Sequence, residues 1–216
     1  GAGFKREGDH IPIQGLGWQV LTSTFGPDGR LFFTLWKPRG NRSQLWALQA
    51  SKETSGMAEL KALLAKGFSS YQADQLVSFL GHADRRIRLQ AQFELANRKE
   101  TKSLRAKAID SKSALLPRLH ALWGLGQLKA RDRDLLKLIC QDKDAEMRAQ
   151  AARWAGDLGF DPDNLIPGLL RDPSPRVRLM AGIACGKLMS KEALEPLTKL
   201  IVDAGNKETV LRHAGI

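Results

Sequence analysis

Residues 20–25 and 30–36 are two short stretches rich in β-branched and aromatic side chains, a pattern typical of β-strands. The residues between them, Gly-Pro-Asp-Gly at 26–29, favour a turn, so we expect a hairpin. A third apolar stretch at 44–48 completes a meander of at least three strands. The central strand is apolar at nearly every position, as strands covered on both faces are. Because this short segment cannot cover both faces of its own sheet, we expect the sheet to pack against something else.

A polar, turn-forming segment at 51–56 marks a boundary, because the pattern after it is helical and strand-like alternation does not recur. Written in rows of 30 residues, the helical part aligns four segments with an unbroken period. Each segment contains an arginine that is followed by an alanine three residues later, and the helix-start column offers Asp and Ser as N-caps. The arginines are Arg88, Arg118, Arg148 and Arg178, and the start column is Asp84, Ala114, Asp144 and Ser174.

We expect a shorter helix before each of these four, at about 73–80, 103–109, 134–140 and 164–170. Helix pairs at this period predict an α-solenoid of about four to five pairs, each burying its apolar stripe against its neighbours. The predicted fold class is mainly α, with a small N-terminal antiparallel β-meander. A last pair, 191–202 and 207–216, stops within its second helix, so we expect the array to be truncated there. The predicted domains are a β-meander over 1–50, a linker and first helix over 51–69, and the solenoid over 70–216.

The arginine column carries a family resemblance. Each of its members has an alanine three residues on, and Asp84 and Asp144 stand four residues before two of them. With this pattern, residues 70–216 resemble HEAT repeats of the short variety found in bilin-lyase-like proteins.

The N-terminal stretch resembles the last blade of a six-bladed propeller of the glucose/sorbosone dehydrogenase type, through Phe-Gly-Pro-Asp-Gly-Arg-Leu-Phe at 25–32 and Gln-Leu-Trp-Ala-Leu at 44–48. The order of propeller end, linker and helical repeat is similar to large secreted planctomycete-type proteins, membrane-bound dehydrogenases with a haem-binding CxxCH module. The resemblance implies that this chain is the non-catalytic middle of an extracytoplasmic or periplasmic protein. The sequence departs from the pattern at Leu35-Trp36, where such propellers carry an Asp before the Trp, and it contains no CxxCH.

The net charge and the cysteine content limit which partners and cofactors this chain can bind. The net charge of +11 is spread along the chain, which favours acidic partners in general. Cys140 and Cys185 are the only cysteines and lie 45 residues apart, which excludes a disulfide scaffold, a thiolate zinc site and covalent haem in this chain. We therefore expect no cofactor here, while the resemblance implies haem c or a quinone in the parent protein. No apolar run reaches the roughly 18 residues of a membrane span, so we expect no membrane insertion.

The arginine column has two interpretations. In the first, each guanidinium bridges a carboxylate of its own or the next repeat and locks the repeats together. The candidate carboxylates are Asp84, Asp142, Asp144 and Asp172. In the second, the column places one positive charge per repeat along a face that follows a nucleic-acid backbone. The nearby acids favour the first interpretation, because a phosphate-binding stripe gains nothing from them.

The other chemistry-bearing residues are expected to be structural. Both cysteines are interpreted as small buried hydrophobes. Trp123 and Trp154 are expected to pack in the core, the alternative being an aromatic on a concave face that stacks a base. No catalytic, cofactor-binding or metal residue is predicted. The histidines lack metal-binding spacing and are interpreted as surface or cap residues: His10, His82, His120 and His213.

Three functions are compatible with this pattern. The first is a binding scaffold, a curved helical surface offered to a protein partner or to other domains of the same polypeptide. The second is nucleic-acid recognition by a basic HEAT surface, as in the alkylpurine DNA glycosylases that share this repeat type. The third is an accessory part of a quinone- or haem-linked oxidoreductase. Because the repeats carry no reactive constellation, the sequence favours the scaffold.

Overall fold

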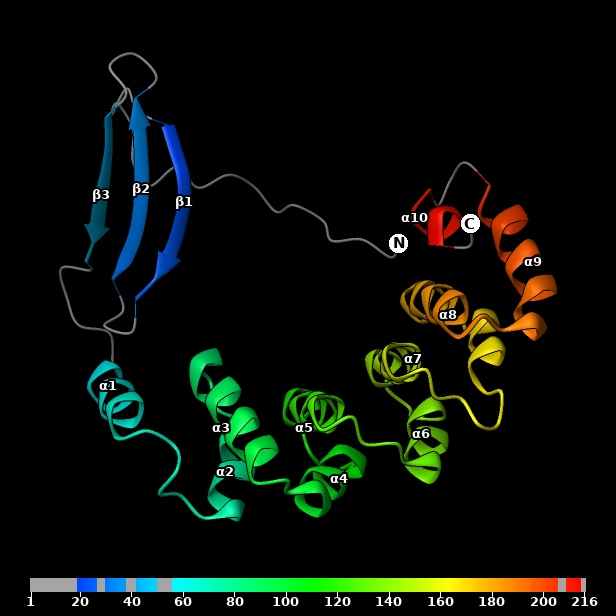
Figure 1. The fold of residues 1–216 in the computed structure, drawn as a ribbon, viewed down its shortest axis with the longest axis horizontal. Helices are drawn as coiled ribbons and strands as arrows, with labels where there is room; N and C mark the ends of the chain where they lie inside the picture. Colours follow the sequence, from blue (N-terminus) through cyan, green and yellow to red (C-terminus); the bar gives the residue numbers. More distant parts are fainter. Residues whose placement is uncertain (1–18, 27–29, 38–41, 50–55, 206–208, 215–216) are drawn as a thin grey trace. The chain divides into compact units, whose positions relative to one another are not determined.

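The computed structural model describes residues 19–26, 30–37, 42–49, 56–205 and 209–214. The chain divides into two compact units, one spanning residues 6–70 and the other containing residues 71–216. The first holds a small sheet and one helix, and the second holds the repeated helices (Figure 1).

The sheet is a three-stranded antiparallel meander, as predicted, with β2 between β1 and β3. In the central strand, Phe33 is paired with Ser23 on one side and Trp46 on the other. Phe33 and Leu35 are buried, whereas every residue of the two outer strands is exposed. The expectation that another surface covers this sheet stays a prediction. The strands are β1 (Gln19–Phe25), β2 (Leu31–Lys37) and β3 (Arg42–Leu48).

Helix α1 (Met57–Lys66) follows the predicted linker, most of which lies outside the described residues. It ends at Gly67, whose φ of 73° lies in a region that residues with a Cβ rarely adopt. The helix therefore stops where the sequence places a glycine.

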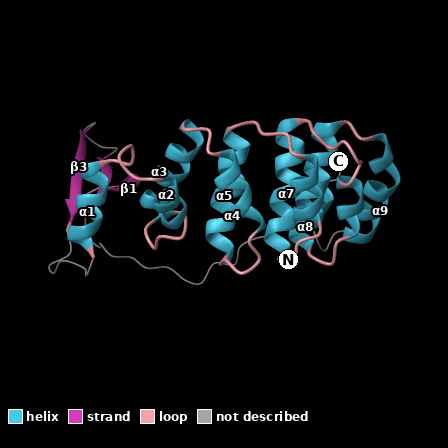
Figure 2. Cartoon of the chain, turned by 90° about the horizontal axis from the view of Figure 1, so that it is seen from below, coloured by secondary structure: helices cyan, strands magenta, loops and turns pink. Residues whose placement is uncertain are grey.

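The helical unit consists of consecutive helix pairs, each a short helix followed by a longer one. The two helices of a pair contact each other, and the longer helices also contact one another in series, α3 with α5, α5 with α7 and α7 with α8. Figure 1 shows the longer helices along the inner side of this unit and the shorter ones along its outer side, and Figure 2 shows them standing in a row. The pairs are α2 (Ala73–Phe79) with α3 (Arg85–Asn97), α4 (Thr101–Ile109) with α5 (Leu115–Gln127), α6 (Arg133–Cys140) with α7 (Ala145–Leu158), η1 (Ile166–Arg171) with α8 (Pro175–Leu188), and α9 (Leu194–Ala204), preceded by the turn η2 (Lys191–Ala193), with α10 (Thr209–Ala214).

One predicted helix differs in kind. The segment expected to be an α-helix at 164–170 is the 3₁₀ helix η1, and Pro167 lies in its first turn. Asn164 has a positive φ of 56°, and the Asp161 carboxylate accepts hydrogen bonds from the amides of Leu165 and Ile166. These local bonds hold the segment in a tight turn instead of a regular helical start.

Small residues allow the longer helices to approach closely. The alanines of the repeated column are all fully buried: Ala91, Ala121, Ala151 and Ala181. The closest approach is at Gly156 of α7, where an added Cβ would lie 2.9 Å from the Cα of Ala184 in α8. Gly186, its counterpart one repeat later, has nothing within 4 Å of the same position. Glycine is therefore needed for close packing at position 156 and not at position 186.

Candidate functional site

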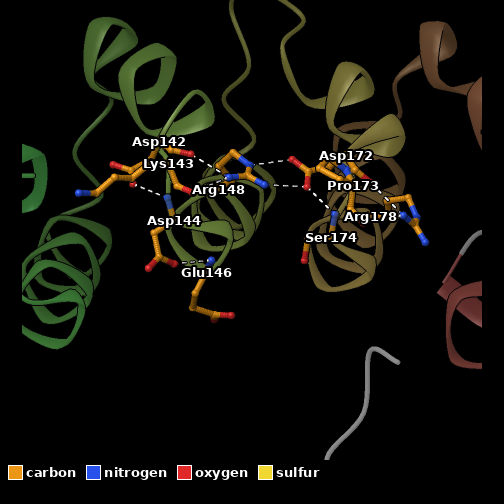
Figure 3. A network of polar contacts seen from close by, with 9 residues as sticks. All are labelled: Asp142, Lys143, Asp144, Glu146, Arg148, Asp172, Pro173, Ser174 and Arg178. Carbon is orange, nitrogen blue, oxygen red and sulfur yellow. Dashed lines mark hydrogen bonds and ion pairs between the residues drawn. The ribbon is translucent and has the colours of Figure 1, made fainter.

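Two arginines of the column pair with aspartates of the following repeat (Figure 3 shows the second pair). The Nη2 of Arg118 donates to the Asp142 carboxylate, and its Nε donates to the carbonyl of Ala108 at 3.1 Å. Arg148 holds Asp172 with both edges of its guanidinium, Nε to Oδ2 at 2.7 Å and Nη2 to Oδ1 at 2.8 Å. The Arg118 side chain is 2% exposed and that of Asp172 is 6% exposed, so both pairs are largely removed from water.

The first and last arginines of the column have no carboxylate partner among the described residues. Arg88 donates through Nη1 to the carbonyls of His82 and Ala83, and through Nε to His120 Nε2 at 3.1 Å. Arg178 donates through Nη1 to the carbonyls of Asp172 and Pro173, at 2.9 and 3.2 Å. Each arginine of the column therefore donates to the loop before its own helix or to the neighbouring repeat. Only the two middle arginines, Arg118 and Arg148, form ion pairs with these aspartates.

Asp84 and Asp144 cap helices and do not form the ion pairs with the arginine column for which they were candidates. Their carboxylates cap helices α3 and α7, each accepting a hydrogen bond at 2.8 Å from the amide two residues on. Asp84 also pairs with Arg86, not with Arg88. Because capping already engages these carboxylates at the helix start, the arginines reach forward to the next repeat instead.

A single spacing explains which arginines are paired. In both ion pairs the carboxylate comes 24 residues after the arginine. The residue at this spacing after Arg88 is Lys112, and after Arg178 it is Val202, so neither can supply a carboxylate. This spacing is the sequence signal that separates paired from unpaired members of the column.

The paired aspartates are held in their charged form. Burial by itself disfavours a carboxylate, but hydrogen bonds from Arg148 and the Ser174 amide outweigh it and keep the pKa of Asp172 below its ordinary value. Burial acts on Asp142 in the same way, and there the bonds from Arg118 and the Asp144 amide lower the pKa. Both pairs therefore remain ionised at neutral pH and act as fixed links between repeats.

A groove of about 630 Å³ opens on the inner helices α3, α5 and α7. Its lining combines aromatic, amide and charged side chains, including Phe93, His120, Trp123, Gln150, Arg153 and Trp154. Grooves of this size with an apolar body and a few placed polar groups are the usual form of binding sites. We take this groove as the candidate site.

His120 lies at the base of this groove and is 2% exposed, so its interpretation as a surface or cap residue is wrong. Its Nδ1 is 2.8 Å from Gln92 Oε1 and its Nε2 accepts from Arg88, an arrangement that requires a neutral ring with the proton on Nδ1. Burial, helped by the charges of Arg88 and Arg85, lowers the pKa of His120 to about 4. His82 accepts a hydrogen bond from the Asp84 amide through Nδ1 and so supports the start of α3.

The two tryptophans differ in their surroundings. Trp154 is 5% exposed, which confirms its predicted core position, and its Nε1 has no hydrogen-bond partner among the described residues. Trp123 is only half-buried, stacks edge-on against His120 at a centroid distance of 4.9 Å, and donates its Nε1 to Gln150 Oε1 at 2.9 Å. Trp123 therefore belongs to the groove as well as to the packing.

A polar chain continues across the repeats from Gln150. Its Nε2 donates to Glu146 at 2.8 Å, and Glu146 pairs with Arg176 of α8 at 3.3 Å. Lys187 of α8 reaches back to Asp157 of α7, which also pairs with Arg153. Arg176 thus pairs with a carboxylate of the neighbouring helix, whereas Lys187 and Arg153 share Asp157.

One column of the inner helices changes at every repeat. At 30-residue spacing it reads Phe93, Trp123, Arg153 and Ile183, and Phe93 and Ile183 are each 41% exposed. Three of these four residues line the groove. The side chains offered to solvent here are large and mostly apolar, and among them Trp123 also bonds to the next repeat.

The described residues offer little for catalysis. Burial raises the pKa of the Cys140 thiol to about 12 and that of Cys185 to about 11, so neither is a nucleophile at neutral pH. In the part of the chain that the structure describes, no group of three or more His, Cys, Asp or Glu side chains could hold a metal ion. Within the same residues, no helix has the length and apolar character that crossing a bilayer requires.

Comparison with known families supports the repeat class. A family model described as HEAT repeats matches residues 133–215, which span α6 to α10. The search of curated proteins gives no match to the chain. The HEAT resemblance seen in the sequence is thus supported for the second half of the helical unit, and the earlier helix pairs share its period and its arginine column.

Proposed function

We propose that the chain is a non-catalytic HEAT-repeat scaffold, an α-solenoid of four to five helix pairs whose inner groove binds a protein partner. The observation that carries this proposal is the changing inner column, which presents Phe93, Trp123, Arg153 and Ile183 where a purely structural repeat would need no large side chain. HEAT repeats are commonly protein-interaction scaffolds, and the match to residues 133–215 supports that class.

The composition of the groove fits a protein partner. Large aromatic and apolar side chains are exposed on it, with Phe93 at 41% and Leu116 at 38%. Aromatic residues surrounded by polar groups are the usual anchors of protein interfaces, because they desolvate a large area at a small cost in conformational entropy. Gln127 and Arg153 supply such polar groups beside them.

The described contacts favour protein over nucleic acid. Binding a phosphate backbone requires cations that are available to it. On the inner helices, Arg86 and Arg176 are each paired with a carboxylate, and Arg153 and Lys187 share Asp157. Arg85 and Arg88, which also line the groove, have no carboxylate partner among the described residues. The positive charge of this face is therefore compensated in part, and the two middle arginines of the column, Arg118 and Arg148, are paired, so that cations available to a phosphate do not recur in every repeat.

Site-specific photo-cross-linking tests the proposal. A photoreactive phenylalanine analogue placed at Phe93 reports on the groove, and one at Ile183 reports on the same column one repeat beyond it. The matched control is the analogue at Leu138 of the outer helix α6, which is 52% exposed. In an extract of the source cells we expect a discrete protein adduct from the two inner positions and none from Leu138. No adduct at either inner position, or the same adduct at Leu138, would contradict the proposal.

The wider context remains a set of proposals. These are the propeller-blade origin of the strands, a large dehydrogenase-like parent protein with haem c or a quinone, and an extracytoplasmic location. Their support is the sequence resemblance of residues 25–48 and the order of the segments. Reading the complete gene for a signal peptide, earlier propeller blades and a CxxCH motif tests all three together, and a gene without any of them would overturn this context.

A further inference from the structure

The last arginine of the column, Arg178, repeats the geometry of Arg148 without its carboxylate. In both residues Nη1 donates to two successive loop carbonyls, at 2.8 and 3.2 Å for Arg148 and at 2.9 and 3.2 Å for Arg178. Arg148 then uses Nε and Nη2 to hold Asp172. For Arg178, no described residue partners these two groups, and Figure 3 shows its guanidinium extending away from the Asp172 carboxylate.

The sequence explains why this position is open. The paired carboxylates, Asp142 and Asp172, stand six residues before the next arginine of the column. The next arginine in the series is Arg212, which follows Arg178 after 34 residues, and the residue six before it is Asn206. The sequence therefore offers no carboxylate at either spacing, neither 24 residues after Arg178, where it has Val202, nor six residues before Arg212, where it has Asn206.

Arg178 lines a pocket of about 590 Å³ between η1, α8, α9 and α10. Two further cations, Arg171 and Lys199, line the same pocket, against a single carboxylate, Asp203. Among the described contacts, Asp203 forms no ion pair with Arg178. The rest of the lining is mainly apolar, with Leu170, Pro196, Leu200, Ala204 and Leu211.

We propose that this pocket binds an aspartate or glutamate side chain of a protein partner, whose carboxylate takes the place on Arg178 that Asp172 takes on Arg148. The planar guanidinium fork offers two parallel donors, which fit a carboxylate and not an amide. Lys199 adds a positive charge, and the apolar lining accommodates residues next to the acid. The proposal shares no residue with the inner groove, so the failure of one leaves the other intact.

The test uses short peptides that copy the loop filling the neighbouring position, Leu170 to Ser174, with alanine in place of Arg171. The probe is acetyl-Leu-Ala-Asp-Pro-Ser-amide, its control has Asn in place of Asp, and sodium acetate reports on a free anion. Titration into the ¹⁵N-labelled chain, followed by the Nε–H signals of the arginines and the amides of α9, measures the binding. We expect progressive shifts centred on Arg178, with the Asn peptide roughly tenfold weaker because it loses a charge-assisted bidentate contact.

Variants locate the binding. Arg178→Gln should abolish the shifts, and Lys199→Gln, at an exposed position, should weaken them severalfold. Arg88→Gln is the matched control, because Arg88 makes the same carbonyl contacts in the same column but does not line this pocket. Equal binding of the Asn peptide, unchanged binding by Arg178→Gln, or no shift up to about 10 mM peptide would overturn the proposal. Acetate acting as well as the peptide would show a free-anion site and overturn the assignment to a protein side chain.

Discussion

The inner helices α3, α5, α7 and α8 present two surfaces, one whose residues recur in every repeat and one whose residues change. At the loop edge, the column of Arg88, Arg118, Arg148 and Arg178 keeps the same residue in every repeat, and each arginine bonds to a loop or to a neighbouring repeat. On the groove side, the column that begins with Phe93 changes at each step, from aromatic to cationic to aliphatic. Both surfaces are set by the same 30-residue period.

This difference in recurrence distinguishes the residues that stack the repeats from the residues that we propose contact a partner. Neighbouring repeats meet through the same geometry each time, so the residues that join them recur. A partner that lies along several repeats meets each of them with a different part of its own surface, so the residues that contact it have no reason to recur. Within one chain, recurrence at the repeat period therefore indicates architecture, and its breakdown at exposed positions indicates a binding surface.

The largest expected effect on stability comes from removing an ion pair between the arginine column and the next repeat. Arg148→Gln leaves the buried Asp172 carboxylate with the Ser174 amide and the charge of Arg178 but without its bidentate partner, so we expect a loss of about 3 kcal/mol in the free energy of unfolding. Urea denaturation at pH 7 measures it. The control is Arg153→Gln on the same helix, whose ion pair is about half exposed and is expected to contribute less than about 1 kcal/mol. Equal effects of the two variants would contradict the division between the surfaces.

His120 joins the two surfaces, because it accepts from Arg88 and lies under the groove. Its pKa is lowered from 6.5 to about 4, so between these values the unfolded chain binds a proton that the folded chain does not. Stability should therefore fall as the pH falls from 6.5 to 4, by up to roughly 3 kcal/mol at about 1.4 kcal/mol per pKa unit. The charges facing this ring, Arg85 and Arg88, remain constant in this window.

His120→Gln isolates this contribution, because glutamine occupies the same column at Gln90 and Gln150. We expect the variant to flatten the dependence of stability on pH between 4 and 6.5, measured by thermal melting across that range. Asp142 and Asp172, whose pKa values are lowered, begin to contribute to acid unfolding at the lower end of this window, and they do so equally in the variant and in the unchanged protein. An unchanged profile in the variant would show that His120 does not carry the effect.

The close approach of α7 and α8 gives a smaller effect. In Gly156→Ala the new methyl would lie 2.9 Å from the Cα of Ala184, so backbone must shift, and we expect a loss of about 1–3 kcal/mol. Gly186→Ala, one repeat later, meets open space and should gain up to about 1 kcal/mol from helix propensity. Paired urea denaturation curves measure both. If both substitutions changed the free energy of unfolding in the same direction, that result would contradict the close approach of α7 and α8 at Gly156.

The smallest effect on stability is expected in the groove. Phe93→Ser and Ile183→Ser remove side chains that are 41% exposed, so each should change the free energy of unfolding by less than about 1 kcal/mol. The same variants should abolish partner capture by a photoreactive group placed at the other of the two positions. If these variants lost much of their stability but still captured the partner, the column would have to be assigned to stacking of the repeats and not to binding.

Much of the helical unit could be predicted from the sequence because its signals are local and repeated. Asp84 and Asp144 identify two helix starts, and the arginine column fixes the register of the longer helices. The apolar spacing at 164–170 is helical and predicts an α-helix, but Pro167 and the bonds from Asp161 make this segment a 3₁₀ helix.

The groove could not be predicted in the same way. The burial of His120 depends on Gln92 and Arg88, which lie 28 and 32 residues away, and no local spacing indicates such a contact. Asp142 and Asp172 are among the predicted carboxylates, but choosing them over the capping aspartates requires knowing that the guanidinium reaches forward to the next repeat. These features depend on how repeats stack, which a pattern within one repeat does not contain.

The division between a stacking edge and a binding groove is tested most directly by hydrogen–deuterium exchange of the full chain with and without the partner that the cross-links identify. Our account predicts that the partner slows exchange in α3, α5 and α7, on the segments around Phe93, Trp123 and Arg153, and leaves the outer helices α4 and α6 unchanged. Protection confined to the outer helices, with the inner segments unaffected, would contradict it.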